Sequence, residues 1–216
     1  AGAMVVPASR GAGATPNMVA RGGGVGGGPA ARKFGFEQNT TDTDSVFSAP
    51  QVNTVVIATR HDSHAQLVCQ ALGAGKHVFV EKPLALTLGE LTAIDRAYTA
   101  SLKAGHDPQV MVGFNRRFAP QVQKMKALLQ GVKEPKVFVM TVNAGAIAED
   151  HWTQDVVVGG GRIVGEACHF IDLLRFLAGS PISGFQAISI GKFPGANVVE
   201  DKASIALRFN DGSIGT

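Results

Sequence analysis

Short apolar segments alternate with amphipathic, helix-like segments through the first half of the chain. The segment at residues 55–58 is β-branched and uninterrupted, as a strand buried on both faces of a sheet is. Residues 77–80 and 110–113 are expected to form the next two strands. Strands that are separated by helices form parallel sheets, because a parallel neighbour needs a crossover connection. The alternation therefore predicts an α/β domain built on a doubly wound parallel sheet.

Capping residues mark where the helices of this domain should begin. Ser63 and Gln66 have the spacing of a capping box, and apolar residues at helical intervals follow them. Thr87 and Glu90 form a second box ahead of another amphipathic segment. Pro120 suits the first position of a third helix. The sequence thus predicts one helix after each of the three strands.

The rhythm changes beyond about residue 118, where strand-like segments follow one another without intervening helices. Consecutive strands of this kind pair antiparallel and belong to α+β domains. We expect one long helix at residues 162–178 and strands at residues 137–142, 182–190 and 203–209.

Two domains are therefore expected: a Rossmann-type domain at residues 1–118 and an α+β domain with a mainly antiparallel, open sheet at residues 119–216. When the segment at 77–80 is counted as the fifth strand, the segment at 17–20 is only the second. We accordingly expect the parallel sheet to lack its first strand. The second domain should be incomplete at Thr216, where a returning strand begins.

A glycine-rich segment invites a different interpretation. Residues 22–27 match the G-x-G-x-x-G pattern of dinucleotide-binding loops, and Asp42 lies about 20 residues further on, where a ribose-binding carboxylate belongs. However, residues 22–28 hold six glycines, so they match by chance as easily, and a flexible loop is the alternative. The strand count favours this alternative, because the phosphate-binding loop follows the first strand of such a domain.

Composition narrows the function classes. The 20 basic and 17 acidic residues leave a net charge of +3 without any basic run, which does not indicate nucleic-acid binding. No apolar run approaches the ~20 residues of a membrane-spanning helix. Two cysteines, Cys69 and Cys168, cannot build a disulfide framework, which is typical of a reducing compartment. We expect a cytoplasmic, globular protein that binds neither nucleic acid nor membranes.

The sequence becomes specific from Val55, with the segment VVIATRHDSHAQLVCQALGAGKHVFVEKPLALT. This segment resembles the Gfo/Idh/MocA family, which includes glucose–fructose oxidoreductase and inositol dehydrogenase. Trp152 and the segment GGGRIVGEACHFIDLLRFLAG at residues 159–179 are similar to the family's substrate-site region. The segments VGFNRRFAP and DHWTQD resemble those of a subgroup in which this module follows a zinc-type alcohol dehydrogenase-like domain. The resemblance implies a nicotinamide-dependent oxidoreductase that acts by hydride transfer on a sugar, cyclitol or nucleotide-sugar-like alcohol.

Lys82 is the first candidate catalytic residue. It follows a predicted parallel strand at the carboxyl end, where open α/β sheets bind ligands. A partly desolvated lysine beside a cofactor can polarise a substrate hydroxyl or carry its proton. The family resemblance implies this role, with a cis bond before Pro83 turning the lysine toward the nicotinamide. A solvated lysine in a turn is the alternative.

His169 and Glu166 are the other candidate catalytic residues. With α-helical spacing, Gly165, Glu166, His169 and Asp172 share one edge of the predicted helix. Histidine exchanges protons near neutral pH. The family commonly places an aspartate four residues before this histidine, whereas this chain has Gly165 there. Glu166 could substitute for that aspartate, or Lys82 and His169 could act alone; a core histidine is the remaining alternative.

The loops that follow the predicted strands should hold the cofactor. The resemblance assigns these loops to the cofactor, and we expect NADP or NAD there. A cation after the second strand suits a 2′-phosphate, so Arg21 favours NADP. His61 and His64 are spaced loosely like a pair of metal ligands. The chain offers no second Cys or His pair with zinc-ligand spacing, so no metal is expected. The predicted cofactor-binding residues are Arg21, Thr59, Arg60, His64, Glu81, Lys82 and Pro83.

Three further expectations complete the prediction. Asn115, Arg116 and Arg117 end a strand and could bind an anionic group or form a solvated turn. A small carbohydrate-like substrate and a homo-oligomer, formed through the sheet of the second domain, are the expected partners. A non-catalytic binding or structural module that retains the fold is the alternative function.

Overall fold

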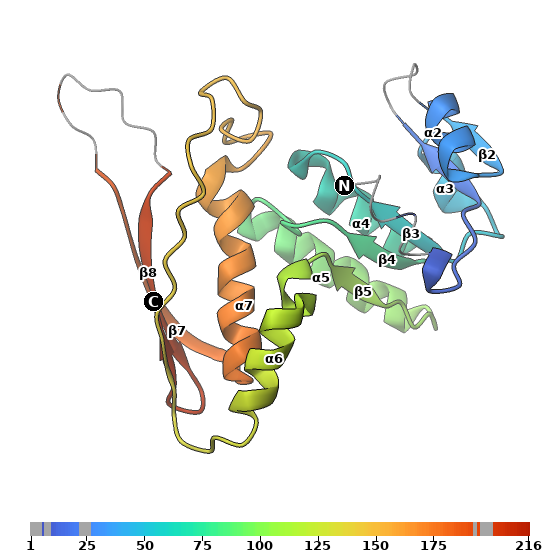
Figure 1. Cartoon of the computed structure of the whole chain (residues 1–216). Helices are drawn as coiled ribbons and strands as arrows, with labels where there is room; N and C mark the ends of the chain where they lie inside the picture. Colours follow the sequence, from blue (N-terminus) through green and yellow to red (C-terminus); the bar gives the residue numbers. More distant parts are fainter. Residues whose placement is uncertain (1–5, 7–9, 22–26, 192–193, 195–200) are drawn as a thin grey trace. The chain divides into compact units, whose positions relative to one another are not determined.

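The computed structural model describes residues 6, 10–21, 27–191, 194 and 201–216. Two compact units make up the chain, Ala1–Val112 and Gly113–Thr216, and each is described separately (Figure 1). The division lies a few residues before the predicted domain boundary between residues 118 and 119. Among the described residues, no helix combines the length and the apolar composition that crossing a bilayer requires.

The first unit contains the three parallel strands that the apolar segments predict. They pair side by side in the order β3-β4-β5. Val55 lies opposite Val78, and Val80 lies between Ile57 and Val112. The Rossmann-type parallel sheet is thereby confirmed, and all three carboxyl ends lie at one edge. β3 is buried on one face only, because Val56 is 45% exposed, whereas burial on both faces was expected. The strands are β3 (Thr54–Ile57), β4 (His77–Val80) and β5 (Val110–Val112).

A second, two-stranded sheet pairs β1 (Met18–Ala20) with β2 (Gln38–Thr40), also in parallel. When these are counted as the second and third strands of a doubly wound fold, the first strand belongs between β1 and β3. No described strand pairs with both β1 and β3. Among the described residues, no strand occupies the first position of such a sheet. Residues 22–26 of the glycine-rich motif lie outside the described residues.

Of the two capping boxes predicted in this unit, one is present in the structure and the other is not. Thr87 Oγ1 accepts the backbone N–H of Glu90, and Glu90 Oε2 accepts that of Thr87, which confirms the second box. The first box was wrong: Ser63 has helical backbone angles and donates to Arg60 O over 2.9 Å. A 3₁₀ turn, η1, precedes this helix, so Ser63 is already inside a helical segment. The helical elements are α2 (Gly27–Phe34), α3 (Asp44–Ser48), η1 (His61–Ser63), α4 (His64–Gly73) and α5 (Leu88–Lys103).

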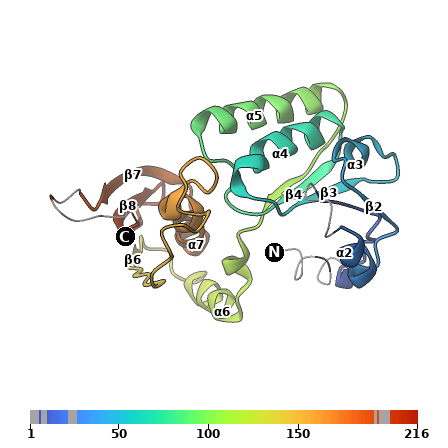
Figure 2. The same ribbon diagram turned by 90° about the horizontal axis from the view of Figure 1, so that it is seen from above.

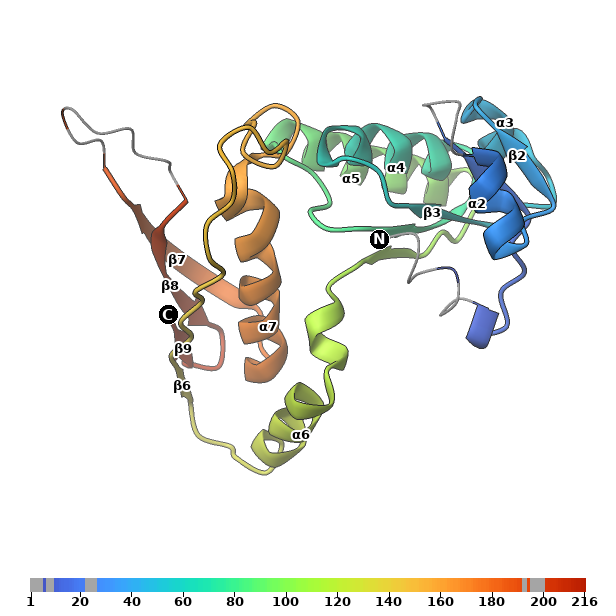
Figure 3. The same ribbon diagram turned by 45° about the horizontal axis from the view of Figure 1, so that its top comes forward.

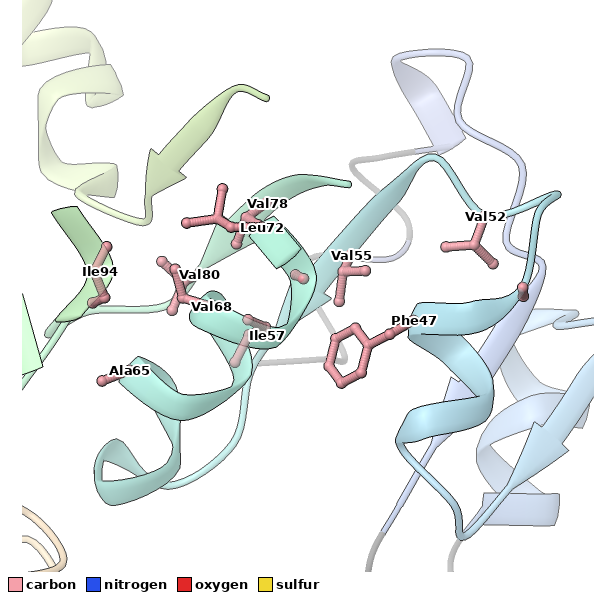
Figure 4. Close-up of a cluster of buried hydrophobic side chains, with 12 residues drawn as sticks. Phe47, Val52, Val55, Ile57, Ala65, Val68, Leu72, Val78, Val80 and Ile94 are labelled. Atoms are coloured by element: carbon pink, nitrogen blue, oxygen red, sulfur yellow. The ribbon is translucent and has the colours of Figure 1, made fainter. Parts of the chain in front are cut away.

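The core of the first unit lies between its three-stranded sheet and the helices that cover one face. Val68, Leu72 and Val80 are 0% exposed, and they meet Phe47 and Ile94 in one cluster (Figure 4). In Figure 2, α4 and α5 lie side by side over the strands. The strand ends are therefore held in fixed positions, because a close-packed interior has low compressibility.

The second unit packs α7 against a four-stranded sheet of order β6-β9-β8-β7 (Figure 3). β7, β8 and β9 pair antiparallel, as expected, and β6 joins β9 in parallel. Leu174 and Ala178 of the helix meet Leu207 and Phe209 of the sheet. The elements are η2 (Asn115–Phe118), α6 (Pro120–Leu129), β6 (Val137–Phe138), η3 (Ile163–Ala167), α7 (Cys168–Ala178), β7 (Ile182–Ser189), β8 (Ala203–Phe209) and β9 (Ile214–Gly215).

Two of the predicted elements in this unit are shorter than expected. The strand expected at residues 137–142 is regular only at Val137–Phe138, although the backbone N–H of Met140 still donates to Thr216 O over 2.8 Å. The helix expected at residues 162–178 is interrupted by η3, a π-helical turn, and continues as α7. Turns of this type often occur at functional sites.

Replacement of Leu72 by alanine tests the core of the first unit. The substitution removes a side chain that is 0% exposed, and it should lower the free energy of unfolding by about 2–5 kcal/mol. Leu88→Ala is the matched control, because Leu88 is 81% exposed and should change stability by about 0.5 kcal/mol or less. Urea unfolding followed by circular dichroism measures both. Equal effects of the two substitutions would contradict the assigned core.

Candidate functional site

Lys82 lies directly beyond the paired part of the parallel sheet. The backbone N–H of Glu81 donates to Ile57 O over 2.9 Å, so the β3–β4 pairing continues to the residue before the lysine. Lys82 is half-buried, and Pro83 is buried. The peptide bond between them is cis, as the resemblance implied. The lysine therefore occupies the edge at which parallel sheets bind ligands.

The loop after β3 reaches the same edge of the sheet. Thr59 and Arg60 follow the strand and are exposed. Thr59 Oγ1 lies 2.6 Å from Ser63 Oγ, which ties the loop to the start of α4. Two exposed polar side chains beside a strand end could bind a ligand. Their cofactor contacts stay a prediction.

His64 belongs to the same region but points into the protein. Its side chain is 0% exposed. Nδ1 lies 2.7 Å from Pro83 O, and Nε2 lies 3.3 Å from Thr59 O. The imidazole thus contacts the backbone of both strand-end loops. Its predicted contact with a cofactor stays a prediction, whereas its contact with Pro83 is a feature that the sequence did not indicate.

Arg21 follows β1 and is exposed, with its backbone N–H donating to Thr40 O. Asp42, the carboxylate of the alternative glycine-loop interpretation, accepts the backbone N–H of Asp44 over 2.9 Å. That contact is local and stabilises the turn before α3. Arg21 remains available to a ligand at its surface, and its contact with a 2′-phosphate stays a prediction.

His169 and Glu166 lie in the second unit, at the start of α7 and in η3. His169 is 7% exposed, and its ring meets Phe114 edge-on at a centroid distance of 6.2 Å. Glu166 is half-buried and Gly165 is buried. The prediction that these residues share an α-helical edge needs correction, because a π-helical turn carries more residues per turn. His169 and Asp172 keep the α-helical spacing, since both lie in α7.

An ion pair that the sequence did not reveal joins η2 to α7. Arg117 Nε donates to Asp172 Oδ2 over 2.6 Å, and its Nη2 donates to Oδ1 of the same carboxylate. Asp172 is 7% exposed. The hydrogen bond to Asp172 raises the pKa of Arg117 above its usual range. A bidentate contact of this kind fixes both position and orientation.

Arg116, the neighbouring cation, stacks 4.6 Å above the ring of Phe170. The segment Asn115–Phe118 therefore holds α7 through two cationic side chains. Asn115 and Arg116 are nevertheless exposed, so their binding of an anionic group stays a prediction. Asp172 is the one acidic residue among the buried residues of α7, and this is the signal that could have suggested a buried partner.

Close packing explains one of the glycines before η3, and backbone conformation explains the other two. A Cβ atom on Gly159 would lie 2.6 Å from Trp152 O and 2.4 Å from the Cα atom of Thr153. Gly160 and Gly161 have φ angles of 77° and 73°, which side chains disfavour. The glycine motif thus lets the chain pass closely over Trp152 before it enters α7.

Metal ligation has no support in the described part of the chain. No group of three or more His, Cys, Asp or Glu side chains gathers there as a metal site would require. His61 and His64 lie with ring centroids 5.6 Å apart. Burial raises the pKa of the Cys69 thiol, which disfavours the thiolate form that binds metals.

Comparison with known proteins decides the family. A family model described as an oxidoreductase family with an NAD-binding Rossmann fold matches residues 21–114. The Gfo/Idh/MocA C-terminal domain matches residues 122–216. The chain belongs to the Gfo/Idh/MocA family. Both units of this family member are covered, and the family resemblance drawn from the sequence is confirmed.

Relatives in the family include enzymes that are named for sugars and cyclitols. Levoglucosan dehydrogenase of Pseudarthrobacter phenanthrenivorans is 29% identical over 87% of this chain and 54% of its own. Myo-inositol 2-dehydrogenase of Thermotoga maritima is 28% identical over 85% of this chain and 54% of its own. This Gfo/Idh/MocA chain therefore spans about half the length of the curated relatives that it matches.

Solved structures agree with the fold. Levoglucosan dehydrogenase in complex with NADH and levoglucosan superimposes with a TM-score of 0.76 at 28% identity, covering 93% of this chain and 56% of the other. A probable dehydrogenase from Thermotoga maritima reaches a TM-score of 0.80 at 23% identity, covering 98% and 63%. The second likeness is one of fold alone. Together they confirm a Rossmann-type unit followed by an α+β unit.

Replacement of Asp172 by asparagine tests the ion pair that holds α7. The change removes the charge that Arg117 binds and should lower the free energy of unfolding of the second unit by about 1–3 kcal/mol. The lower part of this range applies if water screens the half-exposed Arg117. Lys202→Gln is the control, because Lys202 is 68% exposed in its pair with Asp201 and should have little effect. An unchanged denaturation midpoint for Asp172→Asn would contradict the role of the pair.

Proposed function

We propose that the protein is a nicotinamide-dependent oxidoreductase that acts on an alcohol carbon of a small sugar or cyclitol. Membership of the Gfo/Idh/MocA family supports this proposal, as do relatives named levoglucosan dehydrogenase and myo-inositol 2-dehydrogenase. The single observation that carries it is the place of Lys82. This lysine directly follows the β3–β4 pairing at the ligand-binding edge of a parallel sheet.

Lys82 is proposed to handle the substrate's hydroxyl proton. A bound nicotinamide supplies the hydride acceptor or donor for the carbon. Lys82 Nζ would polarise the hydroxyl when protonated and accept its proton when neutral, and half-burial of the side chain limits competition by water. His169 is proposed to assist as a second proton-carrying group. Glu166 is proposed to replace the aspartate that the family commonly has at the position of Gly165.

The residues around the strand ends fit a dinucleotide. The exposed Thr59 and Arg60 offer hydrogen-bond donors, and Glu81 and Lys82 follow the neighbouring strand. NAD is the cofactor that the family description supports. NADP is the finer proposal, because the exposed Arg21 follows β1 where a cation suits a 2′-phosphate.

A non-catalytic module that retains the fold is the second candidate. Gly165 is the observation that favours it, because a glycine cannot supply the carboxylate that the family commonly has there. The two candidates differ in turnover, which only the oxidoreductase should show.

We further propose that the protein forms a homo-oligomer through the outer face of the second unit's sheet. Leu207 is 5% exposed and faces α7, so the other face carries Ala206 and Arg208. Ile188 and Val137, which are 75% and 73% exposed, belong to this outer face by register. Apolar side chains gathered on one sheet face are typical of an interaction surface.

Two remaining proposals concern the protein's context. The segments VGFNRRFAP and DHWTQD resemble the subgroup that carries a zinc-type alcohol dehydrogenase-like domain, and this resemblance supports such a fusion. Free cysteines at positions 69 and 168 support a cytoplasmic location, because thiols stay reduced there.

Replacement of Lys82 by methionine tests the proposed chemistry. Calorimetric titration of the full-length protein with NAD and NADP comes first, followed by a screen of sugars and cyclitols for absorbance of the reduced nicotinamide. Lys82→Met keeps the length of the side chain but carries no proton, so kcat should fall about 10²–10⁴-fold with little change in cofactor affinity. Lys103→Met, on the exposed end of α5, is the control. Binding of neither cofactor at millimolar concentration, or wild-type turnover by Lys82→Met, would refute the mechanism.

Replacement of Ile188 by lysine tests the oligomer. The wild-type protein should exceed monomer mass in light scattering at micromolar concentration, and a buried charge at this position should shift it toward the monomer. Leu91→Lys, on a 42% exposed position of α5, serves as the control and should leave the mass unchanged. A monomeric wild-type protein would rule out the proposed interface.

A further inference from the structure

We propose that His64 is a positioning residue: its imidazole N–H holds the carbonyl of Pro83 and thereby fixes the backbone that carries Lys82. The inference rests on the proposed role of Lys82 and deepens it. It assigns to His64 a function through the loop rather than through contact with a cofactor or substrate. Three features of the first unit support it.

The first feature is the anchoring of His64 itself. The residue opens α4, and its side chain is 0% exposed. Ala65, Val68 and Leu72 of the same helix are 5%, 0% and 0% exposed and belong to the core cluster. The helix is therefore held by close packing, and the imidazole starts from a fixed position.

The second feature is the pair of acceptors that the imidazole meets. Both are carbonyl oxygens, which can only accept: Pro83 O lies 2.7 Å from Nδ1, and Thr59 O lies 3.3 Å from Nε2. A neutral imidazole carries one N–H. The shorter contact assigns this proton to Nδ1, which donates to Pro83 O. Loss of the donor would leave a buried carbonyl without it, which is costly.

The third feature is the place of this hydrogen bond along the loop. The loop starts at Glu81, whose N–H donates to Ile57 O, and it ends where Glu90 Oε2 accepts the N–H groups of Leu86 and Thr87. His64 holds the loop between these two anchors, one residue after Lys82. A reacting group that moves by about 1 Å can lose about 10²-fold in rate. The rate should therefore depend on this donor.

Asparagine and glutamine at position 64 separate the proposed role from a loss of packing. The amide nitrogen of asparagine lies the same number of bonds from Cα as Nδ1, whereas that of glutamine corresponds to Nε2. His64→Asn should keep kcat within about threefold of wild type, and His64→Gln should lower it by about 10–100-fold. The KM for the cofactor should change little in both. His64→Ala, which has no donor, should resemble His64→Gln.

Hydrogen–deuterium exchange of the full-length variants supplies a measurement that needs no substrate. Amides of residues 81–87 should exchange faster in His64→Gln and His64→Ala than in wild type, and close to the wild-type rate in His64→Asn. Amides of β3 should be unaffected in all three. Melting temperatures are recorded to confirm that each variant is folded.

The outcomes distinguish this proposal from the proposed function. A loss of kcat in His64→Asn equal to that in His64→Gln, or unchanged exchange at residues 81–87 in His64→Gln, overturns the positioning role. Faster exchange at residues 81–87 in His64→Gln, together with a wild-type rate in His64→Asn, supports the positioning role of His64. This result counts even if the wild-type protein turns over no substrate. In that case only the proposed oxidoreductase function fails.

Discussion

Parallel pairing of β3, β4 and β5 is the constraint on which the candidate site depends. Val55 and Val78 are both buried and lie opposite one another, so a slip of one residue would turn buried side chains outward. The pairing register thereby sets which residue follows each strand at the ligand-binding edge. Thr59 and Lys82 reach that edge because burial of the strand side chains allows no other register.

Buried polar groups hold the candidate catalytic residues of both units in place. In the first unit, the imidazole of His64 joins a packed helix to the loop beside Lys82. In the second, the carboxylate of Asp172 joins α7, which carries His169, to Arg117 of η2. Both groups are more than nine-tenths buried. Buried polar contacts are costly to break, so each link specifies one arrangement of its site more strictly than apolar packing alone.

Interruptions of regular structure occur where candidate site residues begin. The η1 turn precedes α4 and follows the exposed loop of Thr59 and Arg60. The η3 turn precedes α7 and carries Glu166. The capping box predicted at Ser63 was wrong because Ser63 already belongs to η1 and has helical backbone angles. The continuous helix predicted from residue 162 was wrong because η3 interrupts it.

Local sequence determined the elements and the family. The valine-rich strands, the Thr87 capping box and the Glu-Lys-Pro segment each depend on residues close together in the chain, so their pattern is visible without a fold. Tertiary structure alone decided which side chains hold the site. Arg117 and Asp172 are separated by 55 residues and His64 and Pro83 by 19. Hydrogen bonds between such distant residues form only after the core brings their elements together, and no periodicity in the sequence records them.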